Sequence, residues 1–138
     1  VASGQAASAV AIQNLAANGD NIVASAHLYG GTYNLFKNVL SDMGIEVRFV
    51  DPADPNNFAE ATDENTRAYY GEVLPNPSFE VFPISEVAEI GRPLGIPLIV
   101  DNTAAPVICK PFDHGAAISM HSTTIYRWSW NFYWRNYC

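Results

Sequence analysis

The segment that decides the fold is Ile96-Pro97-Leu98-Ile99-Val100-Asp101-Asn102-Thr103, in which a short apolar run passes directly into a polar turn. A run of this length with turn residues behind it is typical of a strand that is buried on both faces. The preceding stretch, 84–94, has helical spacing and ends at Gly95. A helix that leads into a buried strand predicts a crossover unit, and crossover units build parallel sheets.

The same alternation of helix and strand extends outward from this segment. Helical spacing predicts helices over 5–17, 32–43 and 84–94, with Gly44 as the end of the second. Short apolar runs predict strands over 21–25, 46–50, 67–73, 97–101 and 117–121. The stretch 51–57 is rich in Asp, Asn and Pro and is expected to be a loop. The predicted fold class is therefore α/β, with a mainly parallel sheet, helices on both faces, and ligands beyond the carboxyl ends of the strands.

The composition of the 138 residues is that of a globular interior, with 49% hydrophobic and 15% charged residues. A formal net charge of -7, without a cluster of Lys and Arg, argues against a nucleic acid partner. The apolar runs fall far short of the roughly 20 residues that a membrane helix needs, and the first residues do not form a signal peptide. We expect a soluble, cytoplasmic chain with no membrane partner.

The cysteines and histidines do not indicate a metal site or a disulfide framework. Cys109 and Cys138 lack metal-ligand spacing, and plain thiols suit a reducing cytoplasm. His27, His114 and His121 are far apart in the sequence, so we expect them in loops or at strand ends. No metal ion is predicted.

Two polar segments could bind a phosphate from opposite sides. Ser3-Gly4-Gln5-Ala6 stands at a helix start, where free backbone N–H groups and the helix dipole favour an anion. A plain helix cap is the competing interpretation of this segment. His121-Ser122-Thr123-Thr124 follows the last predicted strand and offers hydroxyl and amide groups.

Three further residues could bind the rest of an aromatic ligand. Tyr29 offers an aromatic face beside Gly30 and Gly31, which let the backbone pass close to a ligand, although an ordinary strand-to-helix turn would have the same residues. Asp101 follows a strand and could pair with a protonated ring nitrogen, or it could cap a turn. Asn76 could bind a ring hydroxyl. Together these groups provide for the phosphate, ring face and ring nitrogen of one cofactor.

Several longer motifs occur in the order seen in one enzyme family. They are Ser-Gly-Gln-Ala-Ala at 3–7, Asp-Asn-Ile-Val at 20–23, Leu-Tyr-Gly-Gly-Thr-Tyr-Asn-Leu-Phe at 28–36, Gly-Ile-Glu-Val-Arg-Phe-Val-Asp at 44–51, Ile-Pro-Leu-Ile-Val-Asp-Asn-Thr at 96–103 and His-Ser-Thr-Thr at 121–124. By these motifs the chain resembles the Cys/Met-metabolism enzymes that depend on pyridoxal phosphate. The 29–36 motif is most similar to that of the O-acetylhomoserine sulfhydrylases.

The resemblance implies a fragment, over 1–124, of the large domain of a fold-type I transferase that binds pyridoxal 5′-phosphate. It implies catalytic roles for Tyr29, which would stack on the ring, and Asp101, which would pair with the ring nitrogen. The implied cofactor-binding residues are Gly4, Gln5, Tyr29, Asn76, Asp101, Thr103, Ser122 and Thr124.

The reaction implied by the resemblance is γ-replacement in methionine and cysteine biosynthesis. O-acetylhomoserine and sulfide or a thiol would give homocysteine or methionine and acetate. Cystathionine synthase, cystathionine lyase and methionine lyase activities stay open as alternatives within the family. Family members form homotetramers, and the oligomeric state of this chain stays open.

One family feature is missing from the sequence. In the family, Thr124 is followed by a lysine that holds the cofactor as a Schiff base, and here that position is Ile125, which cannot form an imine. The remaining lysines are Lys37, on a predicted helix, and Lys110, in a loop, and neither matches the family position. The resemblance predicts an enzyme, whereas the chain as written lacks a group that the catalysis needs.

The segment 125–138 departs from the family pattern and contains all three tryptophans, Trp128, Trp130 and Trp134. Our hypothesis is a shift of reading frame after Thr124. Tryptophan is encoded only by TGG, so a frame read one base later starts each following codon with GG and places a glycine there, as in the glycine-rich continuation of the family motif. The alternative explanation of the segment is a divergent relative with a natural aromatic tail. For the function of the chain, a non-catalytic product of a damaged gene stays open as an alternative.

Overall fold

The computed structural model describes residues 1–78 and 80–123, and its centre is a five-stranded sheet with the strand order β2-β1-β3-β4-β5. The strands are β1 (Asn21–Ser25), β2 (Glu46–Val50), β3 (Thr66–Glu72), β4 (Leu98–Asp101) and β5 (Ile118–Met120). Each neighbouring pair in this order is parallel. Parallel strands bring their carboxyl ends to one edge of the sheet, so polar residues that follow different strands meet there.

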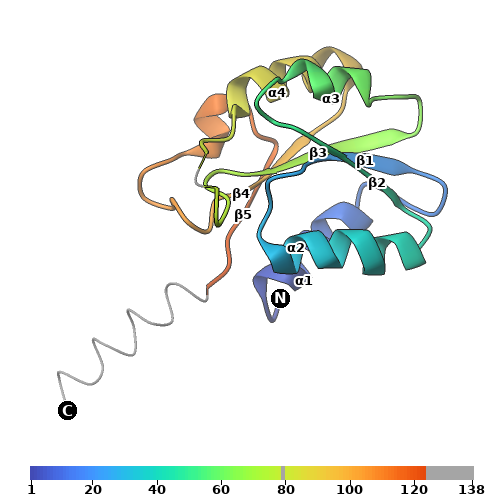
Figure 1. Ribbon diagram of the computed structural model, residues 1–138, viewed down its shortest axis with the longest axis horizontal. Coiled ribbons are helices and arrows are strands. Elements are labelled where there is room, and N and C mark those ends of the chain that lie inside the picture. The colour runs from blue at the N-terminus through green and yellow to red at the C-terminus, as the bar shows by residue number, and fades with distance from the viewer. Residues whose placement is uncertain (79, 124–138) are drawn as a thin grey trace.

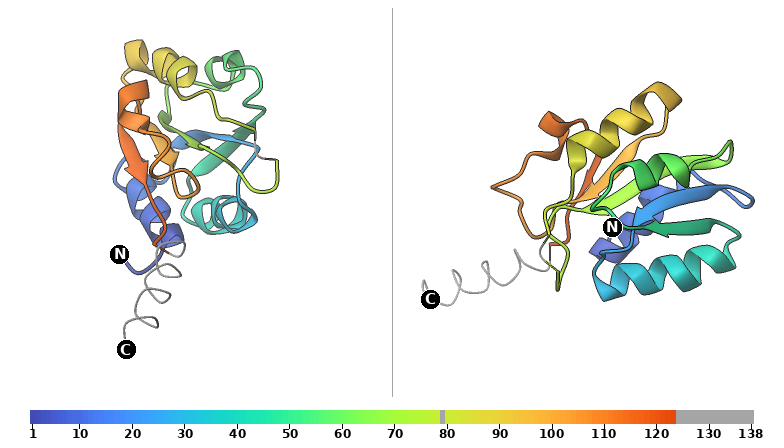
Figure 2. Two further views of the ribbon diagram at one scale, coloured as in Figure 1. Left: turned by 90° about the vertical axis from the view of Figure 1, so that its left-hand side faces the viewer. Right: turned by 45° about the horizontal axis from the view of Figure 1, so that its top comes forward.

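Helices cover both faces of the sheet (Figures 1 and 2). One face carries α1 (Gly4–Gln13) and α2 (Gly30–Asn34), which continues into the π-helix η1 (Leu35–Leu40). The opposite face carries α3 (Asn56–Glu60) and α4 (Ile84–Gly91). Two 3-10 turns complete the described elements, η2 (Arg92–Leu94) and η3 (Pro111–His114). The predicted α/β architecture, with a parallel sheet between two helical layers, is confirmed.

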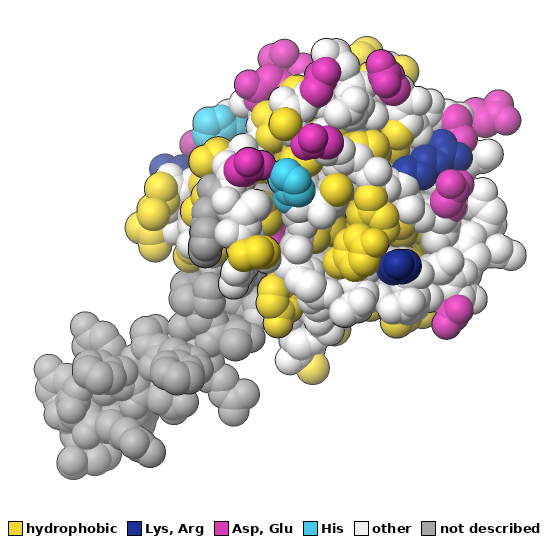
Figure 3. Space-filling model, viewed as in Figure 1, with side chains coloured by type: hydrophobic (Ala, Val, Ile, Leu, Met, Phe, Trp, Pro, Cys, Tyr) yellow, Lys and Arg dark blue, Asp and Glu magenta, His cyan; other side chains and the backbone are white. Residues whose placement is uncertain are grey.

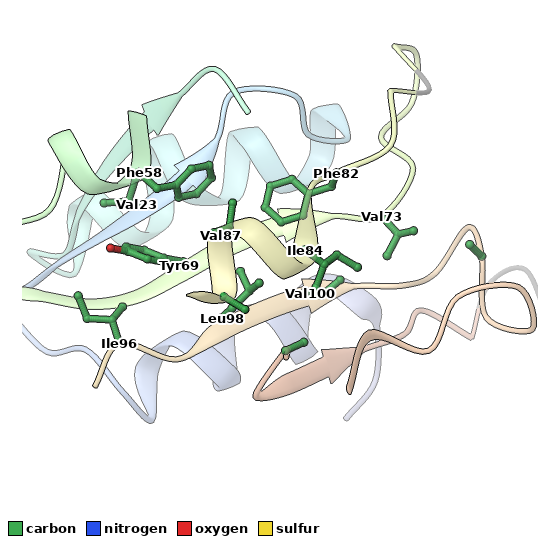
Figure 4. Close-up of a cluster of buried hydrophobic side chains, with 13 residues drawn as sticks. Val23, Phe58, Tyr69, Val73, Phe82, Ile84, Val87, Ile96, Leu98 and Val100 are labelled. Atoms are coloured by element: carbon green, nitrogen blue, oxygen red, sulfur yellow. The ribbon is translucent and has the colours of Figure 1, made fainter. Parts of the chain in front are cut away.

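The sheet separates two hydrophobic cores, because successive strand residues point to opposite faces. Tyr69 on β3 points to the α3 and α4 side, where its ring centroid lies 5.5 Å from that of Phe58 (Figure 4). The next residue, Tyr70, points to the α1 and η1 side, where its ring centroid lies 4.7 Å from that of Phe36. Both tyrosines are fully buried, so the sheet is packed on both faces and holds its strand ends in fixed positions.

Several predicted boundaries are close to those of the structure, and three features differ. The predicted helix 5–17 ends early, at Gln13. Gly44 and Gly95 end their helices with positive φ angles of 76° and 69°, as expected for glycine at a helix end. The predicted helix 32–43 is not a regular α-helix, because it contains the π-helix η1. The spacing of apolar residues indicates which side of the helix is buried, but it does not show which carbonyl each N–H binds. The predicted loop 51–57 ends early, since α3 begins at Asn56.

The surface and the chain's last residues complete the description. Among residues 1–78 and 80–123, no helix is long and apolar enough to cross a bilayer. In the view of Figure 3, acidic side chains gather over α3 and α4, in line with the net charge of -7.

Thr124 and the segment 125–138 lie outside the described residues, so the domain boundary after Thr124 stays a prediction.

Candidate functional site

A cavity of about 470 Å³ opens where the carboxyl ends of β3, β4 and β5 meet the amino ends of α1 and α2. All the predicted cofactor-binding residues within the described part of the chain line this cavity: Gly4, Gln5, Tyr29, Asn76, Asp101, Thr103 and Ser122. The eighth predicted residue, Thr124, lies outside the described residues. The structure therefore brings together residues that are more than a hundred positions apart in the sequence.

One end of the cavity is formed by the first turn of α1 and by Ser122. Ser3 caps the helix, since its hydroxyl accepts a hydrogen bond from the backbone N–H of Ala6 at 3.1 Å. The N–H groups of Gly4 and Gln5 belong to the first turn, which has no acceptors within a helix. A Cβ atom at Gly4 would lie 2.7 Å from the Cβ of Ser122, so only glycine allows this close approach. The cradle fits a small anion held by backbone amides.

Asp101 lies at the end of β4 and is tied to Ser122 through Thr103. Its Oδ1 accepts hydrogen bonds from the backbone N–H of Thr103, at 2.8 Å, and from the Thr103 hydroxyl. The hydroxyl oxygen in turn accepts the backbone N–H of Ser122 at 2.7 Å. Burial raises the pKa of Asp101, and the two hydrogen bonds from Thr103 and the charge of His121 oppose that shift. These contacts hold the carboxylate in one orientation.

Tyr29 stands at the mouth of the cavity, immediately before α2. Its side chain is 56% exposed, which leaves the aromatic ring accessible to a ligand. A Cβ atom at Gly31 would lie 2.6 Å from Cε1 of Tyr29 and would also clash with the side-chain amide of Gln5. Glycine at this position therefore lets the tyrosine ring and Gln5 lie against the backbone of α2.

Glu72 is a cavity residue that the sequence-based predictions missed. It is the last residue of β3 and only 6% exposed, and it is the register partner of Asp101 on β4. Its Oε2 accepts the backbone N–H of Tyr29 at 2.9 Å. Burial first, and then the charge of Asp101, raise the pKa of Glu72 to about 7, against the opposing effect of the Tyr29 N–H. The available signal was an acid at the end of an apolar strand, the same signal that Asp101 gives.

The cavity wall also contains Ser8 and Thr32, neither of which was predicted as a site residue. Ser8 lies in α1, and its hydroxyl is 3.0 Å from the hydroxyl of the buried Tyr70. In residues 1–78 and 80–123, no group of three or more His, Cys, Asp or Glu could hold a metal ion. The groups that could bind a ligand in the cavity are thus amides, hydroxyls, an aromatic ring and two carboxyls.

A protein-family model described as Cys/Met metabolism PLP-dependent enzyme matches residues 1–127. The chain belongs to this family. The match ends before the tryptophan-rich stretch 128–138. Family membership confirms the resemblance drawn from the sequence motifs, and the family is one of enzymes that depend on pyridoxal 5′-phosphate.

Curated relatives and solved structures point to the same branch of the family. The chain is 45% identical over 124 residues to the O-acetyl-L-homoserine sulfhydrylase of Leptospira meyeri, which covers 89% of the chain and 28% of that protein. It is 47% identical over 124 residues to the homocysteine synthase of Schizosaccharomyces pombe, with 88% and 29% covered. The chain therefore spans less than a third of the length of these relatives.

The fold of the chain also matches those of solved structures. A structure assigned as an O-acetylhomoserine (thiol)-lyase of Campylobacter jejuni superposes with a TM-score of 0.87 at 39% identity, over 90% of this chain and 31% of that one. That protein carries a pyridoxyl-lysine phosphate group. The O-acetylhomoserine sulfhydrylase of Wolinella succinogenes superposes with a TM-score of 0.83 at 36% identity, over 88% and 35% of the two chains. The predicted fold class is confirmed as a fragment of a PLP-dependent enzyme.

Proposed function

We propose that this chain is part of a transferase that replaces the acetate of O-acetylhomoserine by sulfide or a thiol, in methionine biosynthesis. The names of the relatives support the reaction class. The observation that carries the proposal is the convergence, in one cavity, of the Gly4 and Ser122 cradle, the Tyr29 ring and the Asp101 carboxylate. An anion cradle, an aromatic face and a carboxylate are complementary to a phosphate, a pyridine ring and its nitrogen.

The residues present fit pyridoxal 5′-phosphate. The phosphate would be held by the first-turn N–H groups of Gly4 and Gln5 together with Ser122. These groups line one end of the cavity, and the space beside Gly4 is too small for a side chain at that position. Asp101 would keep the ring nitrogen protonated, and Thr103 fixes its carboxylate for that task. When bound, the cofactor supplies an electron sink for bond cleavage at the substrate carbons.

Tyr29 and Asn76 would complete the ring site, and Thr124 would add to the phosphate site. Tyr29 would cover one face of the ring and keep water from it, since its side chain lies at the open mouth of the cavity. Asn76 lines the cavity and would hydrogen-bond the ring hydroxyl. The part of Thr124 in this proposal rests on the family motif alone.

The chain as written would hold the cofactor without a covalent bond. Ile125 stands where the family motif has its lysine, and an isoleucine side chain cannot carry out the amine's proton transfers. We attribute the segment 125–138 to a shift of reading frame, so that the intact gene product is the enzyme and this chain is its non-catalytic form.

The test is an assay of the intact protein. The coding DNA on both sides of codon 125 is read, the complete in-frame protein is produced, and it is supplied with O-acetylhomoserine and sulfide. Homocysteine and acetate in equal amounts would support the proposal. Cystathionine formation from cysteine, or release of an α-keto acid without uptake of the thiol, would replace it by another activity of the family.

We also propose that the intact protein is a cytoplasmic homotetramer. Apolar side chains that a larger assembly would cover support this, since Val107, Ile108 and Phe112 are 87%, 88% and 63% exposed. Light scattering on the intact protein should give the mass of four chains, and a monomer would contradict the proposal.

A further inference from the structure

Glu72 is a buried acid that takes part in none of the proposed cofactor contacts. Its side chain lines the cavity, and its Oε1 is buried without a hydrogen-bond partner among residues 1–78 and 80–123. The Thr32 side chain also interacts with Glu72 and favours its charged form, against the larger effect of burial. A buried carboxyl oxygen without a partner is costly to keep, so its position calls for a reason beyond packing.

Glu72 is coupled to Asp101 by the register of the sheet. The two residues are direct partners on adjacent parallel strands, and both line the same cavity. Neither forms an ion pair with a Lys or Arg of the described residues. The charge of Asp101 raises the pKa of Glu72, so an ionised Asp101 favours the protonated form of Glu72.

The contacts of the two carboxyls decide which of them keeps the proton. Asp101 accepts two hydrogen bonds from Thr103, both of which favour its ionised form. Glu72 accepts the backbone N–H of Tyr29 and also interacts with the Thr32 side chain, but it is only 6% exposed, and burial outweighs both contacts and raises its pKa. A proton on the pair is therefore most stable on Glu72, at its unpartnered Oε1.

We propose that Glu72 is a positioning residue that keeps the proton of the Glu72–Asp101 pair, so that Asp101 is the ionised member that faces the ligand. The proposal rests on the proposed cofactor site. With Glu72 neutral, the floor of the cavity carries one negative charge, which matches the single positive charge of a protonated ring nitrogen. The same side chain holds Tyr29 at the start of α2, because its Oε2 accepts the Tyr29 N–H.

The other titratable groups around Glu72 leave this assignment in place. Burial raises the pKa of Glu72 to about 7. Burial also raises the pKa of the Tyr70 hydroxyl, and the charge of Glu72 adds to that rise, so Tyr70 stays neutral. His121, after β5, acts on Asp101 and favours its ionised form. Tyr33 of α2 packs against Phe49, and α1 contains no acidic, basic, His, Cys or Tyr side chain.

The test is a carboxyl titration of the full chain by NMR with ¹³C-labelled glutamate, with the Glu72 signal assigned by its loss in Glu72→Gln. The wild-type midpoint is expected near pH 7, and Asp101→Asn should lower it by on the order of one unit, because a like charge is removed. A wild-type midpoint below pH 5, or one that Asp101→Asn leaves unchanged, overturns the proposal. The titration needs no cofactor, so its failure is separate from a failure of the proposed function.

A second measurement distinguishes the proton from the carboxylate. Glu72→Gln keeps an oxygen for the Tyr29 N–H and cannot ionise, so at pH 6 it should bind pyridoxal 5′-phosphate within about threefold of the wild type. Glu72→Ala loses that oxygen and should bind about tenfold more weakly. If Glu72→Gln binds as weakly as Glu72→Ala, the negative charge is needed and the proposal is wrong.

Discussion

Glu72 and Asp101 are direct register partners at the carboxyl ends of β3 and β4, and their two carboxyls share the floor of one cavity. Asp101 is fixed by Thr103, and Glu72 is fixed by the backbone of Tyr29. The register of the sheet places Glu72 beside Asp101, which is proposed to face the ring nitrogen. Glu72 in turn binds the backbone of Tyr29, which is proposed to cover the ring. The predictions below follow from this arrangement and from the cradle at Gly4.

The first prediction concerns the cradle. Gly4→Ala places a Cβ atom 2.7 Å from the Cβ of Ser122, so α1 and the end of β5 must separate. We expect binding of pyridoxal 5′-phosphate, measured by equilibrium dialysis, to weaken about tenfold, which corresponds to about 1.4 kcal/mol. Gly30→Ala is the matched control, because a Cβ there meets nothing within 4 Å. Equal binding by both variants would contradict the assigned cradle.

The second prediction concerns Thr103. Thr103→Val removes the hydroxyl that donates to Asp101 and accepts from the N–H of Ser122. Because that hydrogen bond lowers the pKa of Asp101, its loss should raise this pKa further. A ¹³C-aspartate titration should show the upward shift in Thr103→Val and none in Thr103→Ser. A downward shift, or the same shift in both variants, would show that the hydroxyl does not act on Asp101.

The third prediction concerns the pH dependence of stability. The folded chain raises the pKa of Glu72 from 4.5 to about 7, so the folded state binds this proton more tightly than the unfolded state. The resulting stabilisation is fully present below pH 4.5 and is lost as the pH rises through about 7. Between pH 5 and pH 8 the free energy of unfolding should fall by about 2 kcal/mol more in the wild type than in Glu72→Gln.

Urea unfolding of both chains at the two pH values measures this difference. Because all other titrating groups are shared, the comparison isolates Glu72. Equal slopes in the wild type and in Glu72→Gln would mean that Glu72 titrates as it does in the unfolded chain.

The fourth prediction concerns the segment after Thr124. If a shift of frame produced it, the DNA of codons 125–138 read one base later encodes a glycine-rich sequence that begins with the family's continuation. The three tryptophans then give three glycines. A coding sequence that gives no such string in another frame would leave a divergent natural tail as the explanation.

Much of the fold was predictable because its signals are local. Apolar runs marked the strands, and Gly44 and Gly95 marked two helix ends whose positive φ angles favour glycine. The π-helix over Leu35–Leu40 was not predictable, because its hydrogen-bond pattern depends on packing against the sheet. The short helix α3, which begins at Asn56, was missed because Asp and Pro in the preceding residues indicate a loop equally well.

The site was predictable in part for a similar reason. Gly4, Tyr29 and Asp101 each stand beside a visible strand or helix end, so their meeting at one edge follows from a parallel sheet. Glu72 gave the same kind of signal, an acid at the end of an apolar strand, but its pairing with Asp101 depends on the register between β3 and β4, which is not visible in either strand alone. Thr103 was predicted as a cofactor residue, and the structure adds its contacts with Asp101 and with the Ser122 backbone.

The most direct test of the central claim is the binding of pyridoxal 5′-phosphate to the full 138-residue chain, measured by equilibrium dialysis and followed by borohydride treatment. The account predicts saturable binding at one site, at least about tenfold weaker binding in Asp101→Ala, and no cofactor fixed to the chain by borohydride. No saturable binding, equal binding by Asp101→Ala, or a borohydride-fixed adduct at Lys37 or Lys110 would contradict it.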